Sequence, residues 1–281
     1  MNNFFFFFLI FLFFDLLLIA QTKNPFFYLF KNQFYAYPFS GWGCRKAFDN
    51  NLPLEKIYFH TQTPFFLQLN ENAHWNFVVS FIHSLKMYNS PNFPIKTPDY
   101  KILANFSYHL NDNFQAIFSI QHHSNGQKDS LYFQNGDLNL DNGNFSVNSF
   151  QIYALKTFSN FPLKWIALQT EHLFFYFSMA YMKKFYFHHA FYLQTLFTNS
   201  FNDSFTIYHH FNWGCFLHLN HRTRFKSEYI AQLKFKNWNF MPFFRAYYGP
   251  DEYNSRYIFQ NFQITVGISS IIKPLLINGK Y

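Results

Sequence analysis

The chain has 281 residues, of which 25% are aromatic and only 13% are charged, enough for one large domain or two small ones. Its mean hydropathy of −0.15 excludes a polytopic helical membrane protein, and the lysines and arginines behind its net charge of +8 form no stripe, which argues against nucleic-acid binding. Many aromatics, few charges and average hydropathy together favour a transmembrane β-barrel, whose apolar and polar faces average out along each strand.

The N-terminal region divides into two parts. Residues 4–20 are almost wholly apolar and are typical of a secretory signal, so we assign residues 1–20 to a signal peptide cleaved near Ala20. A membrane anchor is the alternative, but Asp15 interrupts an apolar run that is already short for a span. Residues 21–54 contain several prolines and glycines, which predict an irregular segment before the barrel.

Residues 55–281 consist of strand-length segments separated by turn residues, which predicts an all-β protein. The segments are 56–69, 75–86, 100–110, 114–123, 145–158, 164–177, 184–197, 204–219, 224–235, 241–248 and 256–271. With one further strand allowed in a poorly divided region, we expect a transmembrane antiparallel β-barrel of about 12 strands. Short turns such as 111–113 alternate with longer loops such as 125–144, as periplasmic turns and external loops do in bacterial barrels.

The last segment shows the expected alternation most clearly. Its apolar side chains share one parity and its polar or small side chains the other, and successive side chains of a strand point to opposite faces. The apolar set is Ile258, Phe262, Ile264, Val266 and Ile268, and the polar set is Asn261, Gln263, Thr265, Gly267 and Ser269. A soluble β-sandwich would also alternate, but the signal segment and the aromatic content favour a membrane barrel.

The same parity places reactive side chains on the apolar face near the external rim. His122 and Ser124 continue the face of Phe118 and Ile120, and Asn148 lies on the apolar face of the following segment. A polar side chain that faces lipid is costly, so three of them near one rim need a reason. The histidine pairs His188-His189 and His209-His210, in contrast, are interpreted as lumen or rim residues.

Nucleophilic catalysis is one such reason. A serine hydroxyl needs a neighbouring base, which His122 can provide to Ser124, and an amide oxygen such as that of Asn148 can orient the imidazole. Backbone N–H groups of Ser124 and Gly126 could face the developing oxyanion. The alternative is that Ser-Asn-Gly is an ordinary turn sequence and that Asn148 is a rim residue.

These residues resemble the signature of the outer-membrane phospholipase A family, which is His-x-Ser-Asn-Gly at a strand end followed by Ser-x-Asn on the next strand. Here the motifs read His122-His123-Ser124-Asn125-Gly126 and Ser146-Val147-Asn148. Weaker similarities occur in the same order before and after them, namely at Ser80-Phe81, Asn89–Phe93, Asp99-Tyr100 and Tyr248–Asn254. The resemblance extends loosely from about Lys56 to Ile272.

The resemblance implies calcium-dependent hydrolysis of the acyl esters of membrane phospholipids at either acyl position, in the bacterial outer membrane and by an active homodimer. It assigns Ser124 as the nucleophile, His122 as the base and Asn148 as the residue that orients the base. It also implies Ca²⁺ ligands at the backbone carbonyl of Gln127, at Ser130 and, from the second subunit, at Asn89 or Ser90.

The sequence departs from the family pattern in two places. His83 stands where the family has a glutamine associated with dimerisation, and the spacing from Ser124 to Asn148 is about twice the family's usual value. Residues 137–143 of the intervening loop resemble the start of an EF-hand calcium loop, and we interpret them first as a solvated loop.

Two other functions are compatible with a barrel. A lipid A deacylase also presents His-x-Ser-Asn but orients the histidine with a glutamate, and no glutamate lies between Ser124 and Asn148. A porin-like or structural barrel would lack catalysis, and a channel needs an open polar interior. A barrel of about twelve strands can instead be filled by side chains, for which the candidates are Gln115, Gln151, Gln169 and Gln263.

Overall fold

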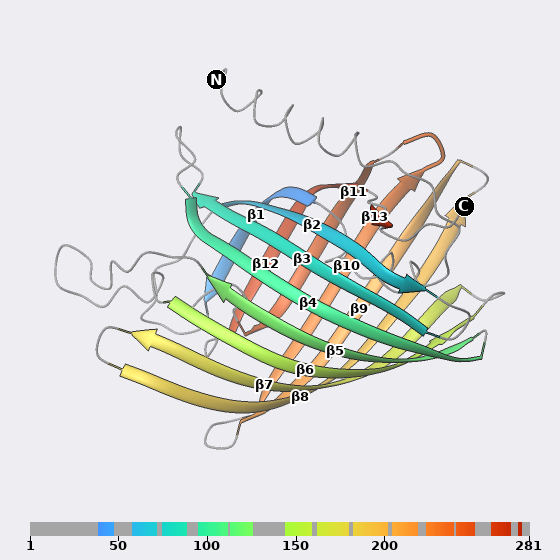
Figure 1. Cartoon of the computed structure of the whole chain (residues 1–281). Coiled ribbons are helices and arrows are strands. Elements are labelled where there is room, and N and C mark those ends of the chain that lie inside the picture. The colour runs from blue at the N-terminus through green and yellow to red at the C-terminus, as the bar shows by residue number, and fades with distance from the viewer. Residues whose placement is uncertain are drawn as a thin grey trace.

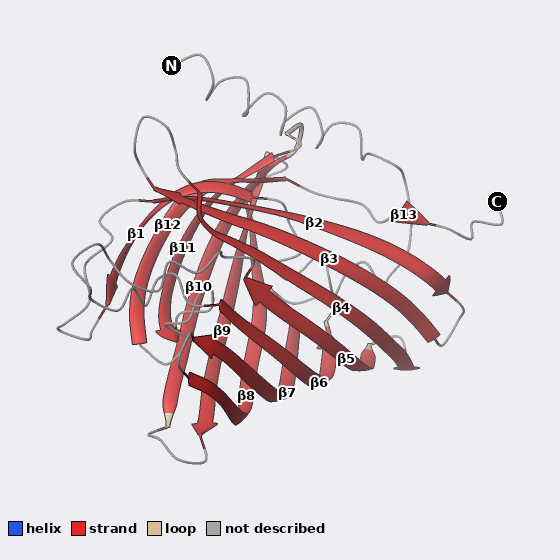
Figure 2. Ribbon diagram, turned by 60° about the vertical axis from the view of Figure 1, so that its left-hand side comes forward, coloured by secondary structure: helices blue, strands red, loops and turns tan. Residues whose placement is uncertain are grey.

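The computed structural model of the protein describes residues 39–47, 58–71, 75–88, 95–111, 113–125, 144–158, 162–179, 182–201, 204–218, 223–238, 240–250, 260–270 and 275–276. All regular structure in these ranges is β-strand (Figures 1 and 2). None of the described residues belongs to a helix that is long and apolar enough to cross a membrane.

The strands form an antiparallel meander in chain order (Figure 1). Each segment delimited from the sequence is a strand, and the predicted ends differ from the observed ones by five residues at most. The strands are β1 (Phe39–Ala47), β2 (Tyr58–Glu71), β3 (Trp75–Tyr88), β4 (Ile95–Asn111), β5 (Phe114–Asn125), β6 (Asn144–Thr157), β7 (Leu163–Met179), β8 (Met182–Phe201), β9 (Phe205–His218), β10 (Arg224–Phe235), β11 (Phe240–Pro250), β12 (Gln260–Ser270) and β13 (Leu275–Leu276).

Strand β1 joins the two ends of this meander. It pairs with β12 over nine residue positions and with β2 over five, so each strand from β1 to β12 has a neighbour on both sides. The short β13 pairs in parallel with β2 at Leu67 and Gln68, beyond the part of β2 that β1 covers. The arrangement confirms the expected antiparallel barrel of about twelve strands. Among the described residues, the pairing of β1 with β2 is the shortest between consecutive strands of β1 to β12.

The position of β1 corrects one expectation. We expected residues 21–54 to be irregular and the barrel to begin at residue 55, but Phe39–Ala47 is a barrel strand. Its glycines suggested a loop, whereas Gly41 permits close packing: a Cβ atom there would lie 2.6 Å from the backbone oxygen of Val266. Glycine in a strand often marks such a close approach. The expected signal peptide and the rest of the 21–54 segment lie outside the described residues.

The predicted alternation of side chains is present. In β12, Gln263 and Thr265 are buried at 2% and 1% exposure, whereas Val266 is 50% exposed and Ile268 is 42% exposed. The four glutamines proposed to fill the lumen are buried, and the large apolar side chains between the inward positions are exposed on the outer wall. A polar interior with an apolar exterior is the pattern of a transmembrane barrel rather than a soluble sandwich.

One end of the lumen is filled by a hydrogen-bonded group above an apolar cluster. The Glu171 carboxylate accepts hydrogen bonds from Gln151 Nε2 at 2.7 Å and from the Tyr192 hydroxyl at 2.9 Å, and the Tyr153 hydroxyl donates to Gln151 Oε1 at 2.5 Å. Below this group, toward the short turns, lie the buried side chains of Ile117, Leu155, Trp165, Ala167 and Leu196. Both sets therefore exclude solvent from the interior of β5 to β8.

The opposite wall carries a buried ion pair. Arg245 Nε donates to Glu228 Oε1 at 2.6 Å, and Lys226 Nζ lies 3.8 Å from Glu228 Oε2. The Lys226 ammonium lies over the rings of Tyr192 and Tyr247, 5.7 and 5.6 Å from their centroids, so that it connects β8 with β10 and β11 across the interior. Charges buried in this way are satisfied by partners rather than by water.

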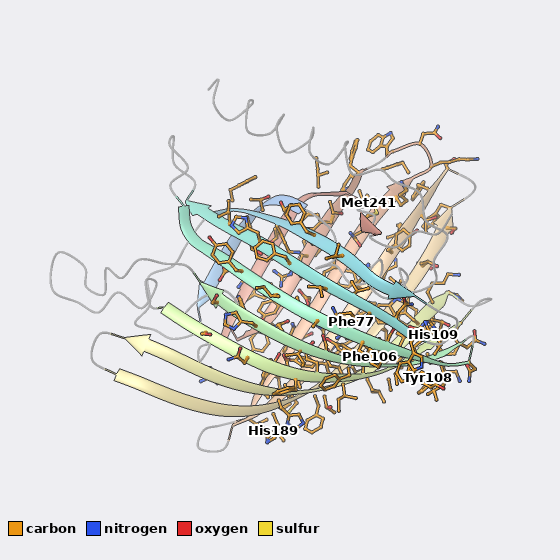
Figure 3. The ribbon with its side chains drawn as sticks, in the orientation of Figure 1. Phe77, Phe106, Tyr108, His109, His189 and Met241 are labelled. Carbon is orange, nitrogen blue, oxygen red and sulfur yellow. The ribbon has the colours of Figure 1, made fainter. Side chains whose placement is uncertain are left out.

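Aromatic side chains gather at the end of the barrel that carries the short turns. Trp75 lies with its ring centroid 4.6 Å from that of Phe106 and 4.3 Å from that of Tyr108. Phe106 and Tyr108 lie together at this end of β4 (Figure 3). A second group on β8 to β11 comprises Phe201, Phe205, Phe235, Trp238 and Phe240. Such a girdle marks the membrane interface of a barrel, so these residues fix one boundary of the apolar band.

The ion pair gives a prediction for stability. Glu228→Gln removes the carboxylate that the buried Arg245 and Lys226 side chains contact, and breaking a buried pair on one side typically costs about 3–5 kcal/mol. Urea unfolding of the protein folded in lipid vesicles should show a loss in this range. Ser227→Ala, at an outward exposed position on the same strand, should change stability by less than about 0.5 kcal/mol. Equal free energies of unfolding for the two variants would contradict a stabilising role for the ion pair.

Candidate active site

Strands β5 and β6 bring the predicted catalytic residues together. Although a long loop separates the strands in sequence, their register pairs His122 with Asn148 and Ser124 with Ser146. His122 and Asn148 are exposed on the outer wall, and their chain neighbours His123, Val147 and Ser149 are buried on the inner side. The parity predicted for His122, Ser124 and Asn148 is therefore present.

A hydrogen bond joins the imidazole to the amide. His122 Nδ1 lies 2.8 Å from Asn148 Oδ1. Because an amide oxygen can only accept, the imidazole carries its proton on Nδ1 in this arrangement. In the neutral ring, Nε2 then holds the lone pair and can accept a proton from another group.

Ser124 is partly exposed on the same face, two residues along β5 from His122. Within the described part of the chain, no hydrogen bond joins its hydroxyl to the imidazole. Side chains two apart on a strand are separated by about 6.6 Å along its axis, so rotation of both about χ1 brings the imidazole toward the hydroxyl. Catalytic hydrogen bonds are often long in an enzyme without substrate and shorten when substrate is bound.

The height of the site on the wall follows from its place in the strand. Ser124 lies ten residues from Phe114, the first residue of β5 at the short-turn end. At about 3.3 Å per residue and a tilt of about 40°, that distance corresponds to roughly 25 Å of height. The apolar band of such barrels is about 25 Å tall, so Ser124 stands near its outer margin. Lipid ester groups occupy this margin, between the acyl chains and the headgroups.

The second histidine of the motif faces the lumen. His123 Nε2 lies 3.5 Å from Asp99 Oδ1, and both side chains are buried behind the wall that carries Ser124 and His122. Asp99 pairs in register with Asn125, and Lys101 with His123, so the contact connects β4 to the end of β5 that leads into the long loop. Its position fits a role in holding the strand that presents the site, and it excludes His123 as a base on the outer face.

On the other side of Ser124, β4 contributes an aromatic side chain that the sequence analysis did not assign to the site. Tyr100 pairs in register with Ser124, and its ring stacks on that of His83 of β3 with centroids 5.1 Å apart. His83 therefore lies on the outer wall beside the site, where the resemblance placed a dimer contact. The alternation in β4 predicts that Tyr100 faces outward. Only the register of β4 with β5 shows that it lies beside Ser124.

The other predicted site residues cannot be placed in the same way. Gly126, Gln127, Ser130, Asn89 and Ser90 lie outside the described residues, as does the EF-hand-like segment 137–143. Among the residues that the structure describes, no group of three or more His, Cys, Asp or Glu side chains could hold a metal ion. The oxyanion role of Gly126 and the calcium ligands therefore stay predictions.

Comparison with solved structures finds the same fold in outer-membrane phospholipases. Outer membrane phospholipase A from Escherichia coli is similar with a TM-score of 0.57 and 12% identity over 91% of this chain and 96% of that one. A Salmonella typhi outer membrane phospholipase dimer with bound calcium has a TM-score of 0.55 and 10% identity over 84% and 91%. An active-site mutant of the E. coli protein has a TM-score of 0.57 and 12% identity over 90% and 95%.

No family model matches the chain, and no curated protein matches its sequence. The likeness in structure is nevertheless nearly full-length in both directions. It establishes that this chain has the fold of a bacterial outer-membrane β-barrel, as the resemblance in the motifs implied, and the apolar outer wall agrees with a position in that membrane.

Proposed function

We propose that the protein is an outer-membrane phospholipase, a serine esterase that hydrolyses the acyl ester bonds of glycerophospholipids and lysophospholipids. The observation that supports it most is the hydrogen bond from His122 to Asn148 on the outer wall, on the same face and at the same rim as Ser124. A barrel whose outer wall serves only as a contact with lipid has no reason to place these three polar side chains there.

The proposed mechanism uses these residues in order. His122 Nε2 accepts the proton of the Ser124 hydroxyl while Oγ attacks the ester carbonyl carbon and forms a tetrahedral oxyanion. Collapse of this intermediate breaks the ester C–O bond, and the imidazolium returns its proton to the leaving lysophospholipid oxygen. Water then attacks the acyl-serine with His122 again as base, which releases a fatty acid and restores Ser124.

Asn148 acts in this scheme by orienting His122. Its Oδ1 accepts from Nδ1, which fixes the ring tautomer with the lone pair on Nε2 and stabilises the imidazolium when it forms. The asparagine cannot itself take up the proton, so the proton stays on the imidazole until the leaving group needs it. The backbone N–H groups of Ser124 and Gly126 are proposed to donate to the oxyanion.

Calcium and a second subunit belong to the proposal as well. The similar Salmonella structure is a calcium-bound dimer, and the candidate ligands Gln127, Ser130 and Asn89 or Ser90 offer carbonyl, hydroxyl or amide oxygens, which suit this hard cation. Calcium bound beside Ser124 would supply positive charge toward the oxyanion.

Two alternatives are less well supported. A lipid A deacylase would orient His122 with a carboxylate, but the partner that contacts its Nδ1 is the amide of Asn148. A passive porin would need an open channel, whereas the interior positions of the barrel hold buried ion pairs, hydrogen-bonded glutamines and an apolar cluster. Asp99 of β4 and Glu171 of β7, the acidic residues on the strands nearby, are both buried on the lumen side.

Single substitutions test the proposed roles. Ser124→Ala and His122→Ala should each lower kcat/KM for phospholipid hydrolysis by about 10³-fold or more, since either change removes the acyl-transfer route. Asn148→Ala should lower it by roughly 10²-fold through misorientation of the ring. Fatty-acid release from mixed micelles by the refolded protein measures these effects.

Ser146→Ala is the matched control, because Ser146 pairs with Ser124 on the neighbouring strand and is also partly exposed. It should keep activity within about threefold of the parent, as expected when no transition-state contact is lost. Phospholipid hydrolysis that survives Ser124→Ala in a folded barrel would rule out the mechanism.

Removal of calcium gives a separate test. Chelation with EGTA should abolish most of the hydrolysis, and added Ca²⁺ should restore it while Mg²⁺ restores much less, because the smaller ion demands stricter octahedral geometry. Ser130→Ala should raise the Ca²⁺ concentration needed for half-maximal activity. Activity that is indifferent to EGTA would remove calcium from the proposal without affecting the serine mechanism.

A further inference from the structure

A second pair of polar side chains faces outward on β7 and β8. His172 and His189 are register partners on these adjacent strands, and the residues beside them in sequence, Glu171 and Ala190, are buried on the lumen side. The two Nδ1 atoms lie 2.7 Å apart, and the rings meet edge to face with centroids 4.6 Å apart. His189 lies on the β7–β8 side of the barrel (Figure 3).

Three apolar side chains flank this imidazole pair on the outer wall. Phe150 is the register partner of His172 on β6, Leu217 is the partner of His189 on β9, and Phe191 follows His189 on the same face. These three side chains are 41%, 42% and 50% exposed on the outer wall. Ionisable side chains toward lipid are rare and generally have a function, so the two histidines require an explanation of their own.

The imidazole pair is distinct from the proposed active site. Asn148 pairs with Phe174, and His172 pairs with Phe150, so Asn148 and His172 are diagonal neighbours about 7–8 Å apart. The hydrogen bond between His122 and Asn148 involves neither His172 nor His189. His172 lies nine residues from Leu163 at the short-turn end of β7, which by the same arithmetic corresponds to roughly 23 Å of height, near the outer margin of the apolar band.

We propose that His172 and His189 form a binding site for a divalent transition metal ion of the copper, nickel or zinc class. Imidazole nitrogens are ligands for these ions at about 2.0–2.1 Å. Two ligand atoms at that distance and at right angles around the ion are about 2.9 Å apart. The Nδ1 atoms, now at the hydrogen-bond distance of 2.7 Å, therefore need to separate by only a few tenths of an ångström while the rings turn to point both lone pairs at the ion. Each neutral ring then carries its proton on Nε2, and both Nδ1 lone pairs face the ion.

The chemistry separates this site from the proposed calcium site. Two nitrogen donors suit borderline ions, whereas calcium takes oxygen ligands. Water or an added chelator would supply the remaining ligands of the ion. Binding at the imidazole pair does not depend on the proposed phospholipase activity and can be measured in a protein that lacks it.

Cu²⁺–iminodiacetate is the probe that fits two imidazoles, because the chelator occupies part of the coordination sphere and leaves neighbouring positions for a pair of histidines. Titration of the folded full-length barrel in detergent should show one tight site per chain. His172→Gln and His189→Gln should each weaken it at least about tenfold. His209→Gln is the control, since His209 also faces outward but its Nδ1 contacts the hydroxyl of Tyr229 at 2.9 Å.

Electron paramagnetic resonance of the unsubstituted protein with the same probe provides a second readout that needs no variant. Superhyperfine coupling to two imidazole nitrogens supports the site, and coupling to a single imidazole contradicts it. Equal binding by the parent and by the folded double variant His172→Gln, His189→Gln would also overturn the proposal. Ser124→Ala should bind the probe as the parent does, so loss of hydrolysis and loss of the metal site can be told apart.

Discussion

The structure depends on the requirement that each barrel strand suits two environments at once, lipid on one face and the barrel interior on the other. Successive side chains must meet lipid on one side and a closed interior on the other, and every backbone hydrogen bond must be made between strands. A charged side chain buried in the interior needs a partner of opposite charge or a hydrogen bond, as Arg245 and Glu228 provide for each other. A polar side chain on the outer wall departs from this alternation of apolar and polar faces, and such a side chain indicates a candidate functional site.

The proposed catalytic site follows from that departure. An enzyme that acts on membrane lipids gains by presenting its nucleophile on the surface that the substrate already covers. The filled lumen supports this arrangement, because the wall behind Ser124 is held by buried contacts such as that of His123 with Asp99. The rigid scaffold keeps His122 and Asn148 in register, and the strand end places them at the height of lipid esters.

Much of the fold was predictable because alternation is a local property. The eleven strands delimited from turn residues and parity are all present, and the outward position of His122, Ser124 and Asn148 was evident from the same count. Strand β1 was missed because Gly41 and its neighbours resemble a loop when read alone. The reason for glycine there is the backbone of β12, which lies more than two hundred residues away in sequence.

Cross-strand partners were the part that the sequence could not supply. The alternation along a strand shows which face a side chain occupies. Its neighbour on the next strand depends on the register of the two strands, which the sequence of a long loop, such as that between β5 and β6, does not determine. The pairing of His122 with Asn148 was expected from the family motif, whereas Tyr100 beside Ser124 and His172 beside His189 emerged only from the structure. The same holds for the lumen, where Lys226 reaches the ring of Tyr192 from two strands away.

The most direct test of the central claim is covalent labelling of the folded barrel with a long-chain alkyl fluorophosphonate, followed by peptide mass spectrometry. An activated serine on the lipid-facing wall predicts a single adduct on Ser124, which His122→Ala abolishes and Ser146→Ala leaves intact. Absence of an adduct on Ser124, or labelling that is unaffected by loss of His122, would contradict the account.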